Sequence, residues 1–220
     1  MKVRALAICA LLASAVWEFG HAGYIHAKAM LAQELLERSW RLSLQGASAP
    51  RPWPWADTWP VARLRMARLG IDEIVLAGSS GRTLAFGPAH VAGSALPGEE
   101  GLSVIAGHRD THFEFLRELV PGDELWIERP DGASVRYQVR ELVVIDSRTD
   151  RVVLDAPVNA LELVTCFPFD VVTAGGPLRY RVLADRVLPA KHFLVAAYRR
   201  IATERAVESK VQSLANRMML

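Results

Sequence analysis

Between residues 61 and 188 the sequence is a series of short apolar, β-prone runs separated by turn residues. The first run, residues 62–67, alternates apolar and basic side chains, which is typical of a half-buried strand. Further runs of this kind cover residues 72–76, 83–86, 102–106, 125–128, 134–139, 142–145 and 161–166. Because the runs are short and follow one another closely, they predict an all-β barrel or sandwich.

One short helix is predicted within this series. Thr111 and Glu114 have the spacing of a capping box, in which a hydroxyl and a carboxyl group satisfy free backbone N–H groups at a helix start. Apolar residues between positions 115 and 119 give this helix a buried face, and Pro121 with Gly122 ends it. His108 is therefore expected in the loop before the helix.

Three of the strand-like runs carry a reactive or charged residue at one end. Residues 161–166 end on Cys166. A thiol needs help to become a nucleophilic thiolate at neutral pH, since the pKa of a free cysteine is about 8.5. Residues 102–106 are followed by Gly107 and His108, a candidate base, and a later run begins near Arg179, a candidate cation. We therefore expect these three side chains to act together.

These residues, taken together, resemble the sortases, a family of membrane-bound cysteine transpeptidases. In that family the active site is a His, a Cys closing a Thr-Leu-x-Thr-Cys-like strand, and an Arg on the next strand. Here Thr165 and Cys166 match that strand, while Glu162 stands at the position of the family's first Thr. The stretches Gly-His-Arg-Asp-Thr-His-Phe and Thr-Cys-Phe-Pro-Phe look most like the sortases of class D and of Gram-negative bacteria. The resemblance covers residues 61–188 and implies a mostly β fold, an eight-stranded barrel with one or two short helices.

The resemblance also implies a role for each catalytic candidate. Cys166 would attack a peptide carbonyl, His108 would serve as general acid and then base, and Arg179 would stabilise the oxyanion. Arg181 competes with Arg179 for that role, because strand alternation puts both side chains on one face. The family's spacing to an alanine at the strand end, here Ala184, favours Arg179.

Two further residues are candidates for supporting roles. Thr165 should point to the opposite face from Cys166 and pack or form a hydrogen bond beneath the site. His112 lies four residues after His108, the spacing of a zinc-binding helical pair, but that motif needs a Glu where this chain has Arg109. The predicted helix cap also falls between the two histidines. We therefore expect no metal or other cofactor, and a structural or substrate-side role for His112.

The family's activity implies a substrate and a product. A sortase cuts a Leu-Pro-x-Thr-Gly-like (LPxTG-like) signal near the C-terminus of a target protein and transfers the resulting acyl-enzyme to an amine on the cell envelope. Two alternatives stay open: an exported cysteine peptidase that hydrolyses the acyl-enzyme, and a non-catalytic barrel that binds envelope peptides. The L,D-transpeptidases also use Cys and His, but their Ser-x-Gly-Cys-like signature is absent from the sequence. A net charge of +2 gives no indication of a nucleic-acid partner.

Residues 1–25 are predicted to form a membrane anchor. Lys2 and Arg4 precede an uncharged apolar run, residues 5–17, which is shorter than the ~20 residues of a typical spanning helix. The span becomes long enough only by including polar residues after position 17. A cleaved signal peptide is the alternative, but no convincing cleavage site directly follows the run. The two positive charges predict a single-pass protein of the inner membrane, in contact with lipid, with its N-terminus in the cytoplasm and its catalytic domain on the outer or periplasmic side.

The remaining sequence predicts four segments. Residues 26–45 keep helical periodicity and are expected to form a stalk or, alternatively, a helix packed on the domain. Residues 46–60 contain four prolines and three tryptophans and predict an extended linker whose tryptophans lie on the domain or at the membrane. Residues 61–188 form the predicted catalytic barrel, and residues 189–220 a basic amphipathic C-terminal helix.

The chain has two cysteines, Cys9 and Cys166. Because Cys9 falls within the predicted span, Cys166 would have no partner in the exported domain. A lone thiol in an oxidising compartment cannot be trapped in an intramolecular disulfide, which suits a working nucleophile.

Overall fold

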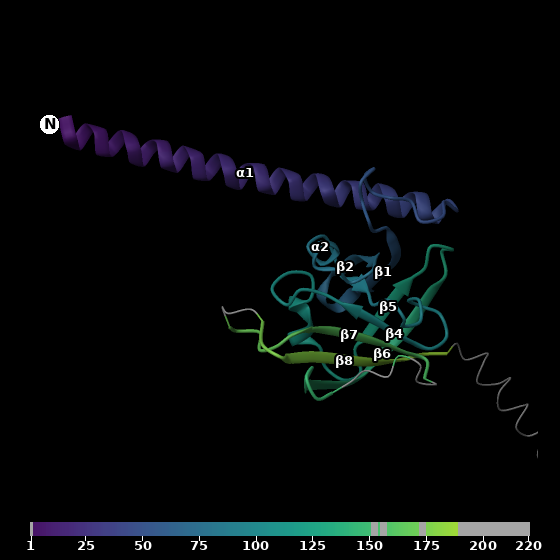
Figure 1. Ribbon diagram of the computed structural model, residues 1–220. Helices are drawn as coiled ribbons and strands as arrows, with labels where there is room; N and C mark the ends of the chain where they lie inside the picture. Colours follow the sequence, from purple (N-terminus) through teal and green to yellow (C-terminus); the bar gives the residue numbers. More distant parts are fainter. Residues whose placement is uncertain (1, 151–153, 155–157, 172–174, 189–220) are drawn as a thin grey trace, which may run out of the picture. The chain divides into compact units, whose positions relative to one another are not determined.

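Eight strands close into a barrel in the computed structural model, which describes residues 2–150, 154, 158–171 and 175–188 (Figure 1). The strands are β1 (Pro60–Met66), β2 (Ile71–Ala77), β3 (Ala89–His90), β4 (Leu102–Ala106), β5 (Glu124–Glu128), β6 (Ser134–Asp146), β7 (Ala160–Cys166) and β8 (Leu178–Arg186). Their order around the barrel is β1-β2-β3-β4-β7-β8-β6-β5. The pairs β2/β3 and β4/β7 are parallel, and the others are antiparallel. The predicted mostly β fold with an eight-stranded barrel is confirmed.

The described helices lie at the N-terminus and in the barrel's connections. They are α1 (Lys2–Leu44), η1 (Ala67–Leu69), α2 (Gly81–Leu84) and η2 (Glu114–Glu118), of which η1 and η2 are 3₁₀-helices. The C-terminal helix predicted at residues 189–220 lies outside the described residues.

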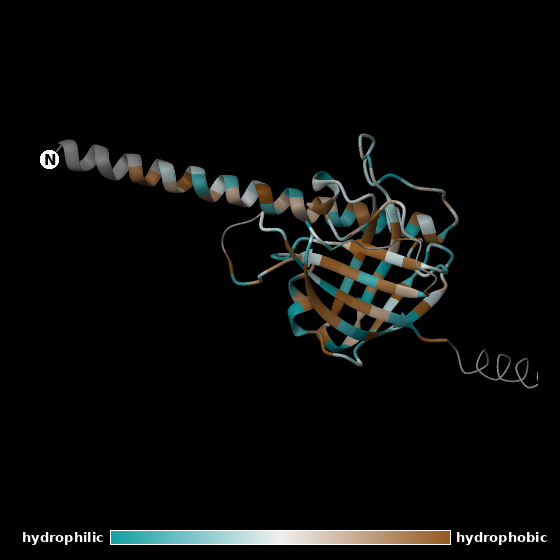
Figure 2. Ribbon diagram, turned by 60° about the horizontal axis from the view of Figure 1, so that its bottom comes forward, coloured by the Kyte–Doolittle hydropathy of each residue, from teal (hydrophilic) through white to brown (hydrophobic). Residues whose placement is uncertain are grey.

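The barrel encloses one large apolar core. Hydrophobic and polar residues alternate along the strands, as the banded colours of Figure 2 show, because successive side chains point to opposite faces. Leu64 of β1, Ile127 of β5, Leu161 of β7 and Val182 of β8 all belong to this core and are fully buried. A smaller apolar cluster covers the outer face of β4, β7 and β8 and includes Val104 and Val164. The strands that carry the site are therefore packed on both faces.

One strand prediction is wrong, and two predicted strands are joined into one. Residues 83–86 were expected to be extended, yet residues 81–84 form α2, because the Ser80 side chain caps this helix by accepting the Thr83 N–H. The runs 134–139 and 142–145 belong to the single strand β6, which pairs with β8 on both sides of an irregularity between Val139 and Glu141. Such a bulge bends a strand without ending it.

The predicted capping box does not form. The helix η2 begins at Glu114, and its N-cap residue is Phe113, which makes no side-chain capping bond. Phe113 is fully buried in the core, and its N–H donates to the carbonyl of His108 across 3.0 Å. Burial of the Phe113 ring therefore decides how the chain turns here, in preference to the local Thr111 and Glu114 signal.

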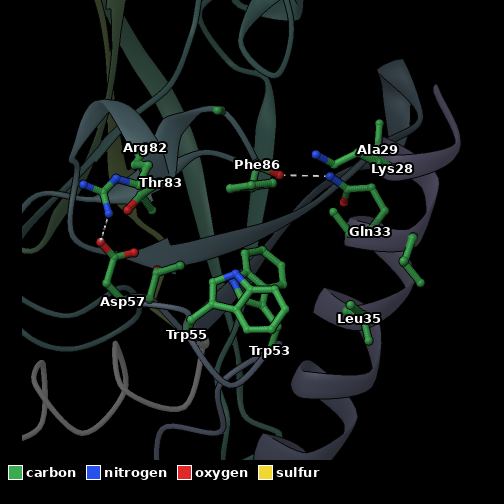
Figure 3. A pocket seen from close by; sticks show the side chains of 14 residues that line it. Lys28, Ala29, Gln33, Leu35, Trp53, Trp55, Asp57, Arg82, Thr83 and Phe86 are labelled. Atoms are coloured by element: carbon green, nitrogen blue, oxygen red, sulfur yellow. Dashed lines mark hydrogen bonds and ion pairs between the residues drawn. The ribbon is translucent and has the colours of Figure 1, made fainter. Parts of the chain in front are cut away.

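The C-terminal part of α1 packs on the barrel domain (Figures 1 and 3). Leu36 and Trp40 are buried against β2 and β3, and the side-chain amide of Gln33 donates to the Phe86 carbonyl across 2.9 Å. Trp53 of the proline-rich segment joins this contact, with its ring 4.9 Å from that of Phe86. The packed-helix alternative for residues 26–45 therefore describes the part of α1 around Leu36 and Trp40.

An open groove of about 580 Å³ lies beside this contact, between α1, residues 53–58 and residues 82–86 (Figure 3). Trp53, Trp55 and Phe86 give it apolar walls, and Arg82 and Asp57 form an ion pair of 3.9 Å at its edge. The predicted site residues are not among those described as lining it.

Within the described residues, no helix combines the length and the apolar character needed to cross a bilayer. The spanning anchor predicted at residues 1–25 is therefore not supported by α1.

Candidate active site

The ends of β4, β7 and β8 bring the three predicted catalytic residues to one edge of the barrel. β4 and β7 run parallel, with Ala106 opposite Val164, and the Gly107 N–H donates to the Val164 carbonyl across 3.1 Å. Their carboxyl ends therefore lie side by side, so that His108 and Cys166 are at the same edge of the barrel. β8 runs antiparallel to β7, and its register places Arg179 directly opposite Cys166.

The pleat of β7 decides which side chains face outward. Leu161 and Leu163 lie in the barrel core, so the alternate residues Glu162 and Cys166 lie on the outer face. Thr165 points the other way and is buried, and its hydroxyl donates to the Gly107 carbonyl across 2.7 Å. This bond joins the residue before Cys166 to the residue before His108.

The three catalytic candidates differ in exposure and in their contacts. His108 is exposed, whereas Cys166 and Arg179 are half-buried. The Nη1 group of Arg179 donates to the carbonyls of Gly176 at 2.7 Å and Leu178 at 2.8 Å. Among the described residues, no hydrogen bond joins the three side chains to one another. A candidate nucleophile, a candidate base and a cation are nevertheless gathered at one edge, and these are the groups that acyl transfer requires.

Glu162 distinguishes Arg179 from Arg181, which strand alternation alone placed on the same face. The Glu162 carboxylate is fully buried and accepts hydrogen bonds from Nε and Nη2 of Arg181 at 2.7 and 2.6 Å. This bidentate pair explains the departure from the family's Thr, because a buried carboxylate needs such a partner. Arg181 is thus held by Glu162, while Arg179 bonds only backbone carbonyls in the described part of the chain.

His112 lies against strand β2. Its Nδ1 is 3.0 Å from Oε2 of Glu73, and both side chains are partly exposed. Of the residues that the structure describes, no three His, Cys, Asp or Glu side chains gather closely enough to hold a metal ion.

Sequence reasoning missed Arg109, the residue after His108. Its guanidinium is only 6% exposed and pairs with Asp110, with 2.6 Å between Nε and Oδ1. The hydrogen bond from Arg109 holds the pKa of Asp110 below its ordinary value. Arg109 also donates to the carbonyls of Pro168 and Val171, beyond Cys166. The Arg-Asp pair directly after a candidate base was the signal that could have drawn attention to it.

Aromatic rings hold the segment that follows Cys166. The ring of Tyr180 on β8 stacks on Phe167 with centroids 6.1 Å apart, and meets Phe169 edge-on at 5.2 Å. Because aromatic pairs of this geometry are favourable, they stabilise the conformation of the chain just after Cys166.

Comparison with known families shows where this site belongs. A family model described as the sortase domain matches residues 64–187, more than half of the chain. This protein belongs to the sortase family. The sortase is 31% identical to Sortase D of Bacillus subtilis over 124 residues, which are 56% of this chain and 62% of that protein. The match thus spans less than two thirds of that relative's length.

Solved structures resemble this sortase in fold. A Clostridium perfringens Sortase D5 transpeptidase superposes with a TM-score of 0.56 at 23% identity, covering 72% of this chain and 99% of that chain. Sortase A from Corynebacterium diphtheriae gives a TM-score of 0.54, also at 23% identity, and covers 72% of this chain and 85% of that chain. At these identities the comparison shows a common fold.

Proposed function

We propose that this sortase is a cysteine transpeptidase that joins a target protein to an amine of the cell envelope. The observation that carries the proposal is the register that sets Arg179 opposite Cys166, with His108 at the same edge of the barrel. Membership of the sortase family and the identity to a Sortase D support the same activity.

The reaction begins at Cys166. Its thiolate attacks the carbonyl carbon of the scissile peptide bond, and the carbonyl oxygen takes up the negative charge of a tetrahedral intermediate. The guanidinium of Arg179 donates hydrogen bonds to that oxyanion, since it keeps its charge and offers donors in a fixed fork. His108 then protonates the leaving amine, the C–N bond breaks, and the acyl group remains on Cys166 as a thioester.

The second half of the reaction returns the enzyme to its starting state. Neutral His108 removes a proton from the incoming amine, which attacks the thioester carbonyl. The new amide bond forms as the C–S bond breaks, and Cys166 leaves as a thiolate. The exposed position of His108 suits this role, because both the departing and the incoming amine must reach it.

The substrate is a protein with an LPxTG-like signal near its C-terminus, cut after the threonine. Residues 1–25 anchor the enzyme in the cytoplasmic membrane with the N-terminus inside, and residues 61–188 form the catalytic domain outside. Lys2 and Arg4 and the general association of sortases with the cell envelope support this placement. Residues 26–45 and 46–60 connect the two parts.

The test is to incubate the protein with an LPxTG-containing peptide and a simple amine, and to follow adduct and product by mass spectrometry. The wild type should form a thioester at Cys166 and transfer the peptide to the amine. We expect Cys166→Ala and His108→Ala to abolish transfer, and Arg179→Ala to lower kcat about 100-fold or more. Arg136→Ala, which removes an exposed β6 arginine paired with Glu124, is the matched control and should act like the wild type.

Two outcomes would favour the alternatives. A folded enzyme that gives hydrolysed peptide at the same rate with and without the amine is a cysteine peptidase. A folded protein that binds the peptide but forms neither adduct nor product, and whose Cys166→Ala variant retains its function in cells, is a binding module.

A further inference from the structure

The side chain of Arg109 is buried beside the candidate active site and donates four hydrogen bonds. It is 6% exposed, and long cationic side chains are rarely buried unless they are paired. Nε and Nη2 donate to the two carboxylate oxygens of Asp110 at 2.6 and 2.9 Å. Nη1 donates to the Pro168 carbonyl and Nη2 to the Val171 carbonyl, the latter across 2.8 Å. A planar fork is suited to holding several acceptors at set angles.

These contacts connect the two halves of the active site. Arg109 follows His108 directly, and Pro168 comes two residues after Cys166, so the bond to Pro168 links the chain just beyond the base to the chain just beyond the nucleophile. On the other side, Thr165 donates to the Gly107 carbonyl across 2.7 Å and links the residues just before them. His108 and Cys166 thus lie between two cross-links.

We propose that Arg109 is a positioning residue that, together with the Thr165–Gly107 bond, holds His108 at a set distance from Cys166 throughout the reaction. The inference rests on the proposed function, because it assumes that His108 and Cys166 act on one substrate. Misplacement of a catalytic group by about 1 Å can lower a rate about 100-fold, so a rigid link of this kind has a large effect on kcat.

The charges around Arg109 agree with this position. Its pKa is raised, mainly by the hydrogen-bonded Asp110 carboxylate and further by the negative charge of Asp170.

Arg117 provides a matched control. It lies on η2, it is also an arginine near the segment after Cys166, and it pairs with Asp170 at 3.2 Å. In contrast to Arg109 its side chain is 41% exposed, and the contacts described for it are with the carboxylates of Asp170 and Glu114. Removal of Arg117 takes away a similar charge from the same neighbourhood without removing a cross-link to the backbone.

The experiment measures transfer kinetics and, separately, the rate at which iodoacetamide alkylates Cys166, read by mass spectrometry of the Cys166 peptide. We expect Arg109→Ala to lower kcat at least about tenfold with little change in KM, and to slow alkylation, while Arg117→Ala acts like the wild type. Arg109→Lys should recover little of kcat or of the alkylation rate, because the lysine keeps the charge but loses the fork that holds the backbone.

A double-mutant cycle distinguishes positioning from general stabilisation. His108→Ala should change the alkylation rate in the wild-type background but hardly in the Arg109→Ala background, since the two side chains are then no longer held together. If the two substitutions change the alkylation rate independently of each other, or if folded Arg109→Ala has the kcat and alkylation rate of the wild type, Arg109 does not position His108. If Arg109→Ala fails to fold, the double-mutant cycle is measured with Arg109→Lys instead.

Failure of the proposed function would be recognised separately. If the wild type transfers no peptide but the alkylation rates show the expected coupling, Arg109 positions His108 and the proposed transpeptidase activity is wrong. If the wild type transfers peptide but the alkylation rates show no coupling between Arg109 and His108, only the positioning role is wrong.

Discussion

At the scale of single residues, Glu162 determines what its neighbour Arg181 can do. A fully buried carboxylate is strongly unfavourable unless it is paired, and the Arg181 fork satisfies both of its oxygens. Arg179, two residues earlier on β8, bonds to the Gly176 and Leu178 carbonyls, which a substrate oxyanion could replace as acceptors. One residue that departs from the family pattern therefore pairs with one arginine and leaves the other available for the proposed chemistry.

This difference predicts that two alanine substitutions lower the stability by different amounts. Arg181→Ala leaves the Glu162 charge buried without its partner and should lower the free energy of unfolding by about 3–5 kcal/mol. Arg179→Ala removes no carboxylate contact described here and should change it by less than about 1 kcal/mol. Denaturant unfolding of both variants measures the difference, and equal losses would contradict this division of roles.

At the scale of elements, α1 is joined to the barrel by both apolar and charged contacts. Ala32, Leu36 and Trp40 recur every four residues and so lie along one side of the helix, where they are buried. Arg63 of β1 donates to Glu37 of α1 across 2.9 Å and also pairs with Asp72 of β2. Burial raises the pKa of Asp72, but the hydrogen bond and charge of Arg63, with the charge of Arg65, outweigh it and leave this pKa below its ordinary value. Asp72 therefore remains ionised, and this network ties the helix to two strands.

The packing of α1 predicts a stability difference between two leucines of the same helix. Leu36 is 1% exposed, so Leu36→Ala should lower the free energy of unfolding by about 2–5 kcal/mol through lost burial and a new cavity. Leu31 is 60% exposed, so Leu31→Ala should change it by no more than about 0.5 kcal/mol. Thermal unfolding of the two variants provides the comparison, and similar stabilities would show that α1 does not pack on the barrel.

At the scale of the whole molecule, the proposed anchor and the barrel serve different tasks in one chain. The barrel brings the reactive groups together, while the N-terminal segment would keep the enzyme where its substrates emerge. Apolar side chains of α1, including Leu12, Val16 and Phe19, are 61–80% exposed within the chain itself.

The proposed anchor predicts how the protein partitions in cells. The wild type should remain in the membrane pellet after alkaline extraction. Leu12→Lys, with a charge costing about 2.5–3.5 kcal/mol near the middle of the proposed span, should shift protein to the soluble fraction. Ala27→Lys lies beyond the span and should behave like the wild type. A wild type found in the soluble fraction would show that residues 1–25 do not anchor it.

The sequence alone determined most of the segments that become strands and which residues are candidates for the chemistry. Alternation of apolar and polar side chains indicates which face of a strand is buried, and this pattern can be recognised without knowing the partner strand. The positions of Cys166, His108 and Arg179 at the ends of such runs, with their resemblance to sortases, were enough to predict the barrel. The two-residue strand β3 was missed, because a stretch that short has no readable period.

Only the tertiary structure decided which ends meet and which polar groups are already occupied. The parallel pairing of β4 with β7 joins residues that are more than fifty positions apart in the chain, and it brings Gly107 to Thr165. The burial of Arg109 and the pairing of Arg181 with Glu162 depend on neighbours from other segments. Local periodicity specifies the faces of an element, whereas its partners are chosen by the packing of the whole barrel. The roles of the arginines around Cys166 therefore follow from the fold, although the arginines themselves can be read in the sequence.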